Sequence, residues 1–127
     1  MNLSGFAAVG LGAACGAWLR WLLSHSLNHL LPGLPLGTLI ANLTGAYLIG
    51  LALGLFALNP AISLEARLLI TTGFLGGLTT FSTFSAEAIG LFSRQEYGWA
   101  AAHILGHLLG SLLMTALGLW TVQMLRN

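Results

Sequence analysis

The chain has 127 residues, of which 57% are hydrophobic and 6% are charged, and its formal net charge is +1. Four basic and three acidic residues cannot solvate the surface of a globular domain this apolar, which argues against a water-soluble fold. The absence of lysine and the scatter of the four arginines argue against nucleic-acid binding. Cys15 is the single cysteine, which excludes an intramolecular disulfide and a cysteine-based zinc cage, and we expect its side chain to be buried.

Four apolar stretches are long enough to cross a bilayer, whose hydrocarbon core needs about 20 residues of helix. They cover approximately residues 3–26, 37–58, 65–92 and 99–125. The connections between them are short and carry helix-breaking residues, such as Asn59 and Pro60 after the second stretch. We therefore predict an all-α integral membrane protein in which residues 1–127 form a single transmembrane domain of four helices, with consecutive helices antiparallel.

Glycines recur at four-residue spacing in every predicted helix. The pairs are Gly12 and Gly16, Gly50 and Gly54, Gly73 and Gly77, and Gly106 and Gly110. This spacing places small residues on one helical face, where two backbones can approach closely within a membrane. So many packing faces on four helices are consistent with oligomerisation, and packing within the chain explains them equally well.

The basic residues show no bias toward one side of the membrane. Arg67 and Arg126 are expected on the side of the N-terminus, whereas Arg94 and a snorkelling Arg20 are expected on the other side. A chain without such a bias can insert in either direction, and two opposite insertions can pair about an axis in the membrane plane. The alternative is that another feature of the chain sets its orientation.

The third stretch contains the segment Gly73-Phe-Leu-Gly-Gly-Leu-Thr-Thr-Phe-Ser-Thr-Phe-Ser85, in which glycines precede a run of hydroxyl residues. Helix propensity is poor there, so we predict a broken helix around Gly76 to Thr79. The alternative is a continuous helix whose Ser and Thr side chains bond to the preceding turn. If the helix is broken, carbonyls released near Gly76 and Thr79 could hold a small monovalent cation such as sodium where two copies meet, in a structural role.

Phe81 and Phe84 are three residues apart and share a helical face. An aromatic ring carries a positive edge, so two rings presented edge-on in a dry constriction can favour an anion that has lost its water. Packing in the protein core is the other interpretation of such a pair.

Polar residues also occur inside the second and fourth stretches. Asn42 offers two amide hydrogens, and a polar side chain at this depth faces the bundle or a water-filled cavity. In the fourth stretch a single polar stripe is formed by His103, His107, Ser111 and Thr115. Such a stripe can replace an ion's hydration shell stepwise. Hydrogen bonding between helices is an alternative, and a metal site is another, although the histidine pair lacks an evident third ligand.

Arg20 and Glu87 are the charged residues set farthest into apolar stretches. Charge inside a membrane costs at least a few kcal/mol, so each residue should be paired, snorkelling or functional. Arg20 could draw anions into a vestibule or anchor its helix end. Glu87 could accept hydrogen bonds and brace the broken helix, and a lone carboxylate also permits proton coupling.

These residues resemble the Fluc, or CrcB-type, fluoride channels over essentially the whole chain. The matching segments are Gly-Ala-Trp-Leu-Arg20, the Gly37-Thr-Leu segment that leads to Asn42, and the glycine- and hydroxyl-rich segment of the third stretch. The resemblance implies an antiparallel, dual-topology homodimer with two fluoride pores. It also implies a central sodium ion held by backbone carbonyls from the break in the third helix.

The resemblance assigns roles by motif position. Phe81 and Phe84 correspond to the pore-lining phenylalanines, and Asn42 corresponds to the pore asparagine of the second helix. Further pore residues are Ser82 and Thr83, together with Ser111 and Thr115 from the polar stripe. The sodium-coordinating backbone positions correspond to Gly76 and Thr79, and Arg20 belongs to the vestibule. His103 and His107 stand where the family pattern leads us to expect tyrosine or hydroxyl residues.

The implied function is passive export of cytoplasmic fluoride across a bacterial inner or plasma membrane, without enzymatic activity. The implied partners are a second copy of the chain and the lipid bilayer, and pairing with a paralogue stays open. The alternative function is a small proton-coupled, dual-topology antiporter, which commonly carries a carboxylate in its first helix, where this chain has none. A third possibility is an assembly subunit without transport, which leaves the hydroxyl-rich segment unexplained.

Overall fold

A computed structural model describes all residues from 1 to 127, and the fold is entirely helical. Its long helices are α1 (Leu3–Leu27), α2 (Leu36–Leu58) and α6 (Tyr97–Arg126). Even α2, at 23 residues, is longer than the roughly 30 Å of hydrocarbon that a helix must cross. With the helical span Leu64–Ser93, four segments are long and apolar enough to cross a membrane. The prediction of a four-helix membrane fold is therefore confirmed.

The third span is built from four short elements. They are α3 (Leu64–Leu68), the π-helical segment η1 (Leu69–Leu75), α4 (Gly76–Leu78) and α5 (Phe81–Ser93). Between α4 and α5 the backbone is extended, with φ −86° and ψ 153° at Thr79 and φ −150° and ψ 112° at Thr80. We call these two residues the extended pair. The Thr79 hydroxyl donates to the Leu75 carbonyl at 2.8 Å. This is the kind of side-chain bond to the preceding turn that the alternative of a continuous helix predicted.

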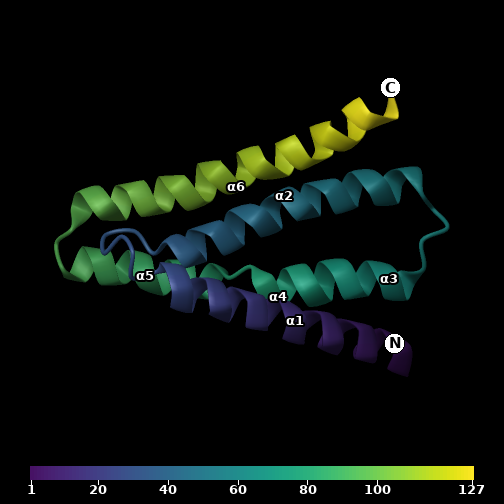
Figure 1. Cartoon of the computed structure of the whole chain (residues 1–127), viewed down its shortest axis with the longest axis horizontal. Helices are drawn as coiled ribbons and strands as arrows, with labels where there is room; N and C mark the ends of the chain where they lie inside the picture. Colours follow the sequence, from purple (N-terminus) through teal and green to yellow (C-terminus); the bar gives the residue numbers. More distant parts are fainter.

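The four spans lie alongside one another, and both chain termini lie at the same end of the bundle (Figure 1). α2 packs mainly against α6, whereas α1 packs mainly against η1 and α4. Short turns join the neighbours, with Asn59 ending α2 and Gln95, at φ 59°, in the turn before α6. Side-chain caps start three of the helices: Asn2 accepts from Gly5 N, Ser63 from Ala66 N, and Thr80 from Thr83 N.

Glycines allow α1 and the third span to touch through their backbones. A Cβ atom on Gly16 would overlap the carbonyl oxygen of Phe74, and one on Gly77 would overlap that of Ala13. Gly50 of α2 meets the α6 backbone in the same way, at Thr115. These glycines therefore serve packing within the chain. Gly106 differs, because the nearest atom to its Cβ position is a Leu39 methyl at 4.0 Å.

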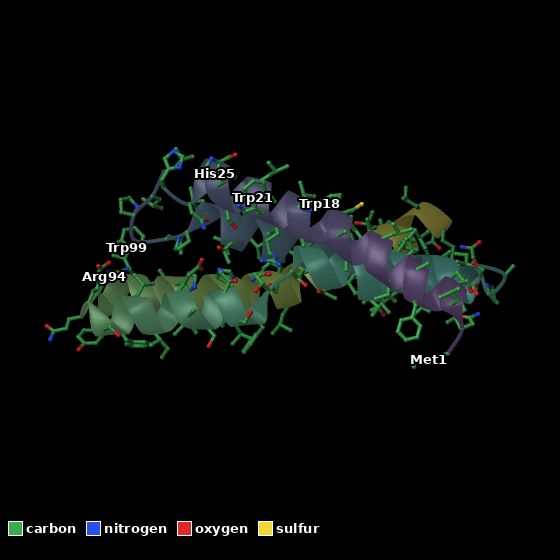
Figure 2. The ribbon with its side chains drawn as sticks, turned by 90° about the horizontal axis from the view of Figure 1, so that it is seen from below. Met1, Trp18, Trp21, His25, Arg94 and Trp99 are labelled. Atoms are coloured by element: carbon green, nitrogen blue, oxygen red, sulfur yellow. The ribbon has the colours of Figure 1, made fainter.

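The single chain buries few side chains, because only 21 of its 127 residues are buried. The core cluster is small and consists of Ala41, Leu75 and Leu78 with partly buried neighbours. Figure 2 shows Trp18 and Trp21 on the outward side of α1, where both are 65% exposed. Cys15 is also exposed, so the expectation that it is buried was wrong. The neighbouring Gly16 takes the face of α1 that meets the third span, which leaves Cys15 at the surface.

The close approach of α1 to the third span predicts a stability difference between two alanine variants of α1. Gly16→Ala should lower the free energy of unfolding by about 1–3 kcal/mol, because the added methyl group collides with backbone that cannot move cheaply. Gly10→Ala is the matched control, since nothing lies within 4 Å of its Cβ position. Thermal unfolding of the purified variants in detergent measures both effects, and equal melting temperatures would contradict the packing described.

Candidate functional site

A cavity of about 650 Å³ lies on one side of the bundle, between α2, the third span and α6. It is lined by Asn42, Gly45, Ala46, Ile49, Thr71, Leu75, Gly76, Thr79, Thr80, Phe81, Phe84, Ile104, His107, Leu108, Ser111, Leu112 and Thr115. None of these is an aspartate, glutamate, lysine or arginine. The wall therefore offers amide, hydroxyl, imidazole and aromatic groups without a fixed carboxylate or basic side chain.

Most of the candidate residues from the sequence meet at this cavity. Those that line it are Asn42, Gly76, Thr79, Phe81, Phe84, Ser111 and Thr115. Ser82, Thr83 and Arg20 are not part of the lining. Thr83 turns toward the start of its own helix, where its hydroxyl oxygen accepts from Thr80 Oγ1 at 3.0 Å. Of the two histidines in the polar stripe, only His107 reaches the cavity.

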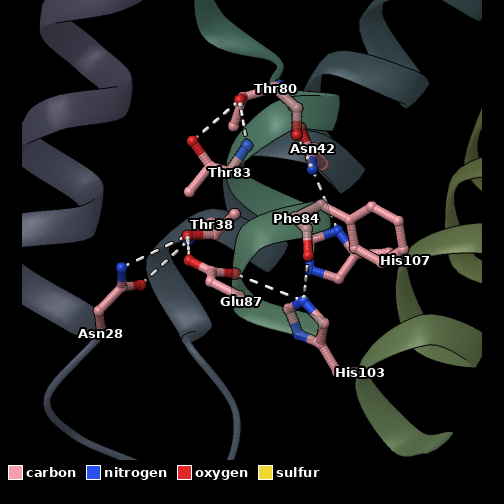
Figure 3. Close-up of polar contacts among 9 residues, drawn as sticks. All are labelled: Asn28, Thr38, Asn42, Thr80, Thr83, Phe84, Glu87, His103 and His107. Atoms are coloured by element: carbon pink, nitrogen blue, oxygen red, sulfur yellow. Dashed lines mark hydrogen bonds and ion pairs between the residues drawn. The ribbon is translucent and has the colours of Figure 1, made fainter. Parts of the chain in front are cut away.

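The Asn42 side chain makes two hydrogen bonds to the backbone of Thr80, the second residue of the extended pair (Figure 3). Its Oδ1 accepts from the Thr80 amide at 2.7 Å, and its Nδ2 donates to the Thr80 carbonyl at 3.0 Å. Backbone groups that leave a helix inside a membrane need such partners, because lipid offers none. Asn42 therefore satisfies the backbone of Thr80 and ties α2 to the start of α5. Thr80 was missed as a functional residue because its backbone, not its side chain, makes this contact.

The same contact fixes the protonation pattern of His107. Asn42 Nδ2 also lies 3.0 Å from His107 Nδ1, and the two bonds to Thr80 set which end of the amide faces the ring. Asn42 must then be the donor and Nδ1 the acceptor, so a neutral His107 carries its proton on Nε2. Both amide hydrogens of Asn42 are therefore used within the chain.

The hydroxyl groups of the lining differ in how freely they can meet an ion. Thr79 donates to the Leu75 carbonyl, and Thr115 donates to the Ala46 carbonyl at 3.0 Å. Ser111 also lines the cavity, and its hydroxyl makes no hydrogen bond within the chain. Ser111 is therefore the hydroxyl that can donate into the cavity without giving up an existing bond.

Phe81 and Phe84 stand at the cavity wall with their rings tilted by 57° and their centroids 5.4 Å apart. The Phe84 ring also packs on the imidazoles of His103 and His107, at centroid distances of 5.2 and 4.8 Å. Phe81 is 80% exposed in the single chain. Phe84 is thus held by its neighbours, whereas Phe81 projects from the bundle.

Two carbonyls beside the extended pair lose their helical partners. In a continuous helix Thr80 N would bond the Gly76 carbonyl, but it donates to Asn42 instead. Thr83 N would bond the Thr79 carbonyl, but it donates to Thr80 Oγ1 at 3.1 Å. The amides that would occupy these carbonyls are thereby engaged elsewhere. Backbone carbonyl oxygens are ligands that suit small alkali cations, so Gly76 and Thr79 fit the sodium role that the resemblance implies.

Arg20 contacts α4 and is not part of the cavity lining. Its Nε donates to the carbonyl of Gly77 at 2.9 Å, which satisfies one of the carbonyls at the end of α4. The sequence suggested a vestibule or a snorkelling anchor for this arginine and did not indicate a bond to Gly77. No local signal links the two residues, which are 57 positions apart.

Glu87 belongs to a second polar group, whose contacts are drawn in Figure 3. Thr38 donates its hydroxyl to Glu87 Oε1 at 2.6 Å, and His103 Nε2 lies 3.4 Å from Oε2. Asn28 orients Thr38 by donating from Nδ2 to its hydroxyl at 3.3 Å and accepting from its amide at 3.1 Å. Glu87 accepts hydrogen bonds, as expected, but it braces α2 and not the extended pair. Thr38 could have been found from the sequence, because it precedes Asn42 by one helical turn.

The model of the family described as CrcB-like protein, Camphor Resistance (CrcB), matches residues 7–119. A protein of Cupriavidus pinatubonensis named "Fluoride-specific ion channel FluC" is 63% identical over 125 residues, which cover 98% of this chain and 99% of the relative. Proteins of the same name from Cupriavidus taiwanensis and Nitrosospira multiformis are 61% and 58% identical, each over 98% of this chain and over 99% and 98% of the relative. This chain therefore belongs to the CrcB family of multi-pass bacterial membrane proteins.

Proposed function

We propose that this chain conducts fluoride passively across a bacterial membrane as an antiparallel, dual-topology homodimer. The observation that carries the proposal is the cavity, whose wall combines hydrogen-bond donors and aromatic rings without an aspartate, glutamate, lysine or arginine. The relatives named as fluoride-specific ion channels support the choice of ion. Residues 1–127 act as one transmembrane domain in this proposal.

The proposed mechanism replaces the water around fluoride with donors of the protein. Ser111 offers its unpaired hydroxyl, and the rings of Phe81 and Phe84 offer positive edges. Asn42 can bond the ion by exchanging its contact with His107 Nδ1 for fluoride, while its two bonds to Thr80 keep the amide in place. A larger halide needs the same donors at longer distances. Because the donors are held in place by the surrounding structure, they cannot easily move apart to fit it.

The remaining pore assignments are part of the same proposal. Ser82 and Thr83 follow Phe81 at the exposed start of α5, where a second copy would enclose them. Thr115 extends the line of polar groups one turn beyond Ser111. Arg20 bonds Gly77 through Nε alone, so its two other guanidinium nitrogens can attract anions to a vestibule.

A second copy would complete the site. Phe81 is 80% exposed and Leu112 is 64% exposed at the rim of the cavity, which suits burial against another chain. Two opposed copies would bring together the carbonyls of Gly76 and Thr79 from both chains around a sodium ion. That ion would neutralise the converging carbonyl dipoles and would not move during conduction.

A proton-coupled antiporter is not favoured. Such a mechanism needs a carboxylate where substrate binds, but Glu87 does not line the cavity and its Oε1 is occupied by Thr38. The cavity of the single chain therefore contains no carboxylate at which a proton and a substrate would compete for binding.

Fluoride transport can be tested with purified protein in liposomes. We expect release of trapped fluoride when valinomycin and a potassium gradient allow charge to balance, and no release of chloride under the same conditions. A fluoride electrode and a chloride electrode measure the two fluxes. Absence of fluoride release from well-folded protein, or equal chloride release, would contradict the proposed function.

The aromatic edges can be tested by isoleucine variants. Phe81→Ile and Phe84→Ile should each reduce fluoride flux by about tenfold or more, because the apolar bulk stays and the positive ring edge is lost. Phe92→Ile is the control on the same helix, since Phe92 contacts Tyr97 and does not line the cavity. Wild-type flux in both cavity variants would contradict a role of the ring edges in conduction and would indicate that the two rings serve packing.

Dual insertion can be tested with single cysteines near Asn2 and Asn127 in a Cys15→Ser background. Both termini lie at one end of the bundle, so both positions report the same side of the membrane (Figure 1). A membrane-impermeant thiol reagent should label about half of the chains in intact cells and all of them after permeabilisation. Complete labelling or complete protection in intact cells would exclude opposed pairs.

A further inference from the structure

Glu87, His103 and His107 form a compact cluster between α5 and α6. One ligand atom from each residue lies within 4.8 Å of the others. His103 is 0% exposed and His107 is 4% exposed, so both imidazoles are withdrawn from the surface. The cluster is separate from the carbonyls beside the extended pair, and its existence does not depend on the proposed transport function. Figure 3 shows the three side chains converging below Asn42.

The cluster contains polar atoms without partners. Glu87 Oε2, His103 Nδ1 and His107 Nε2 are buried and make no hydrogen bond. Buried polar groups in folded proteins are nearly always paired, so unpaired atoms concentrated in one place indicate a site that a further group completes. All three atoms, a carboxylate oxygen and two imidazole nitrogens, are of kinds that bind transition metals.

The spacing suits tetrahedral coordination. Two ligands about 2.1 Å from a zinc ion lie about 3.4 Å apart when the site is tetrahedral. The distance between His103 Nε2 and Glu87 Oε2 is 3.4 Å. His103 Nε2 also lies 3.2 Å from the Phe84 carbonyl, so a metal ion at Nε2 would replace this hydrogen bond and leave the imidazole proton on Nδ1. Because the three ligand atoms lie within 4.8 Å of one another, no pair has to close by more than about 1.4 Å to reach this spacing.

We propose that Glu87, His103 and His107 form a binding site for a divalent transition metal ion of the zinc class. The sequence showed a histidine pair without a third ligand, and the fold supplies that ligand from α5. Two imidazoles and one carboxylate favour zinc, cobalt or nickel over magnesium or calcium, which prefer oxygen ligands. His107 also lines the cavity, which gives the ion a route to the cluster and leaves a fourth coordination position.

Asn42 should weaken the metal site. A metal ion on His107 Nε2 moves the ring proton to Nδ1, which then faces the donor hydrogen of the Asn42 amide. Metal-bound histidines normally donate their other N–H to an acceptor, so this neighbour has the wrong polarity.

The test is a calorimetric titration of purified protein in detergent with ZnCl₂. His25→Gln and His29→Gln are introduced together as the background, because these two histidines are exposed and lie outside the cluster. We expect saturable binding of about one Zn²⁺ per chain, and Co²⁺ should give the visible absorption of a tetrahedral site. The proposal would be overturned if this folded background protein, whose cluster is intact, showed no saturable Zn²⁺ binding.

Cluster variants then assign the ligands. Glu87→Gln and His107→Gln should each weaken Zn²⁺ binding by about tenfold or more, whereas Glu96→Gln, which alters a surface ion pair with Arg94, should leave it unchanged. Each variant is compared with the background at matched size-exclusion elution. Binding that Glu87→Gln leaves unchanged would overturn the proposal.

Discussion

The need to satisfy backbone groups inside lipid governs this structure. At Thr79 and Thr80 the third span leaves the helical conformation, and the released amide and carbonyl of Thr80 find partners on one side chain, Asn42 of α2. Without these bonds, each orphaned group would cost several kcal/mol in a hydrocarbon environment. The two residues after α4 can therefore be extended because α2 places an amide opposite them.

The surrounding packing follows from this constraint. Glycines let α1 approach α4 closely enough for Arg20 to bond the Gly77 carbonyl, so the end of α4 has a partner from a second direction. Asn42 in turn fixes the tautomer of His107, whose ring packs on Phe84. Backbone satisfaction, aromatic orientation and the polarity of the cavity wall are thus linked through a single amide.

The sequence predicted local features well, and it could not identify the distant partners. Hydropathy placed the ends of the four spans within two residues of the observed bounds, and glycine spacing identified backbones that do touch. Bonds such as Thr38 to Glu87 and Asn42 to Thr80 join residues 49 and 38 positions apart, and periodicity carries no information on such pairs. For the same reason Glu87 was not recognised as a neighbour of the histidine pair. Cys15 was misplaced because an apolar residue in a membrane helix has no intrinsic preference for the inward face.

The central claim is that a wall of neutral donors passes fluoride without coupling to protons. Planar bilayers with fluoride on one side, chloride on the other and an opposing pH gradient test it directly through the reversal potential of the current. The account predicts that the current reverses toward the fluoride equilibrium potential and that this potential is unchanged when the pH gradient is removed. A reversal potential that moves with the pH gradient, or one set by chloride, would contradict it.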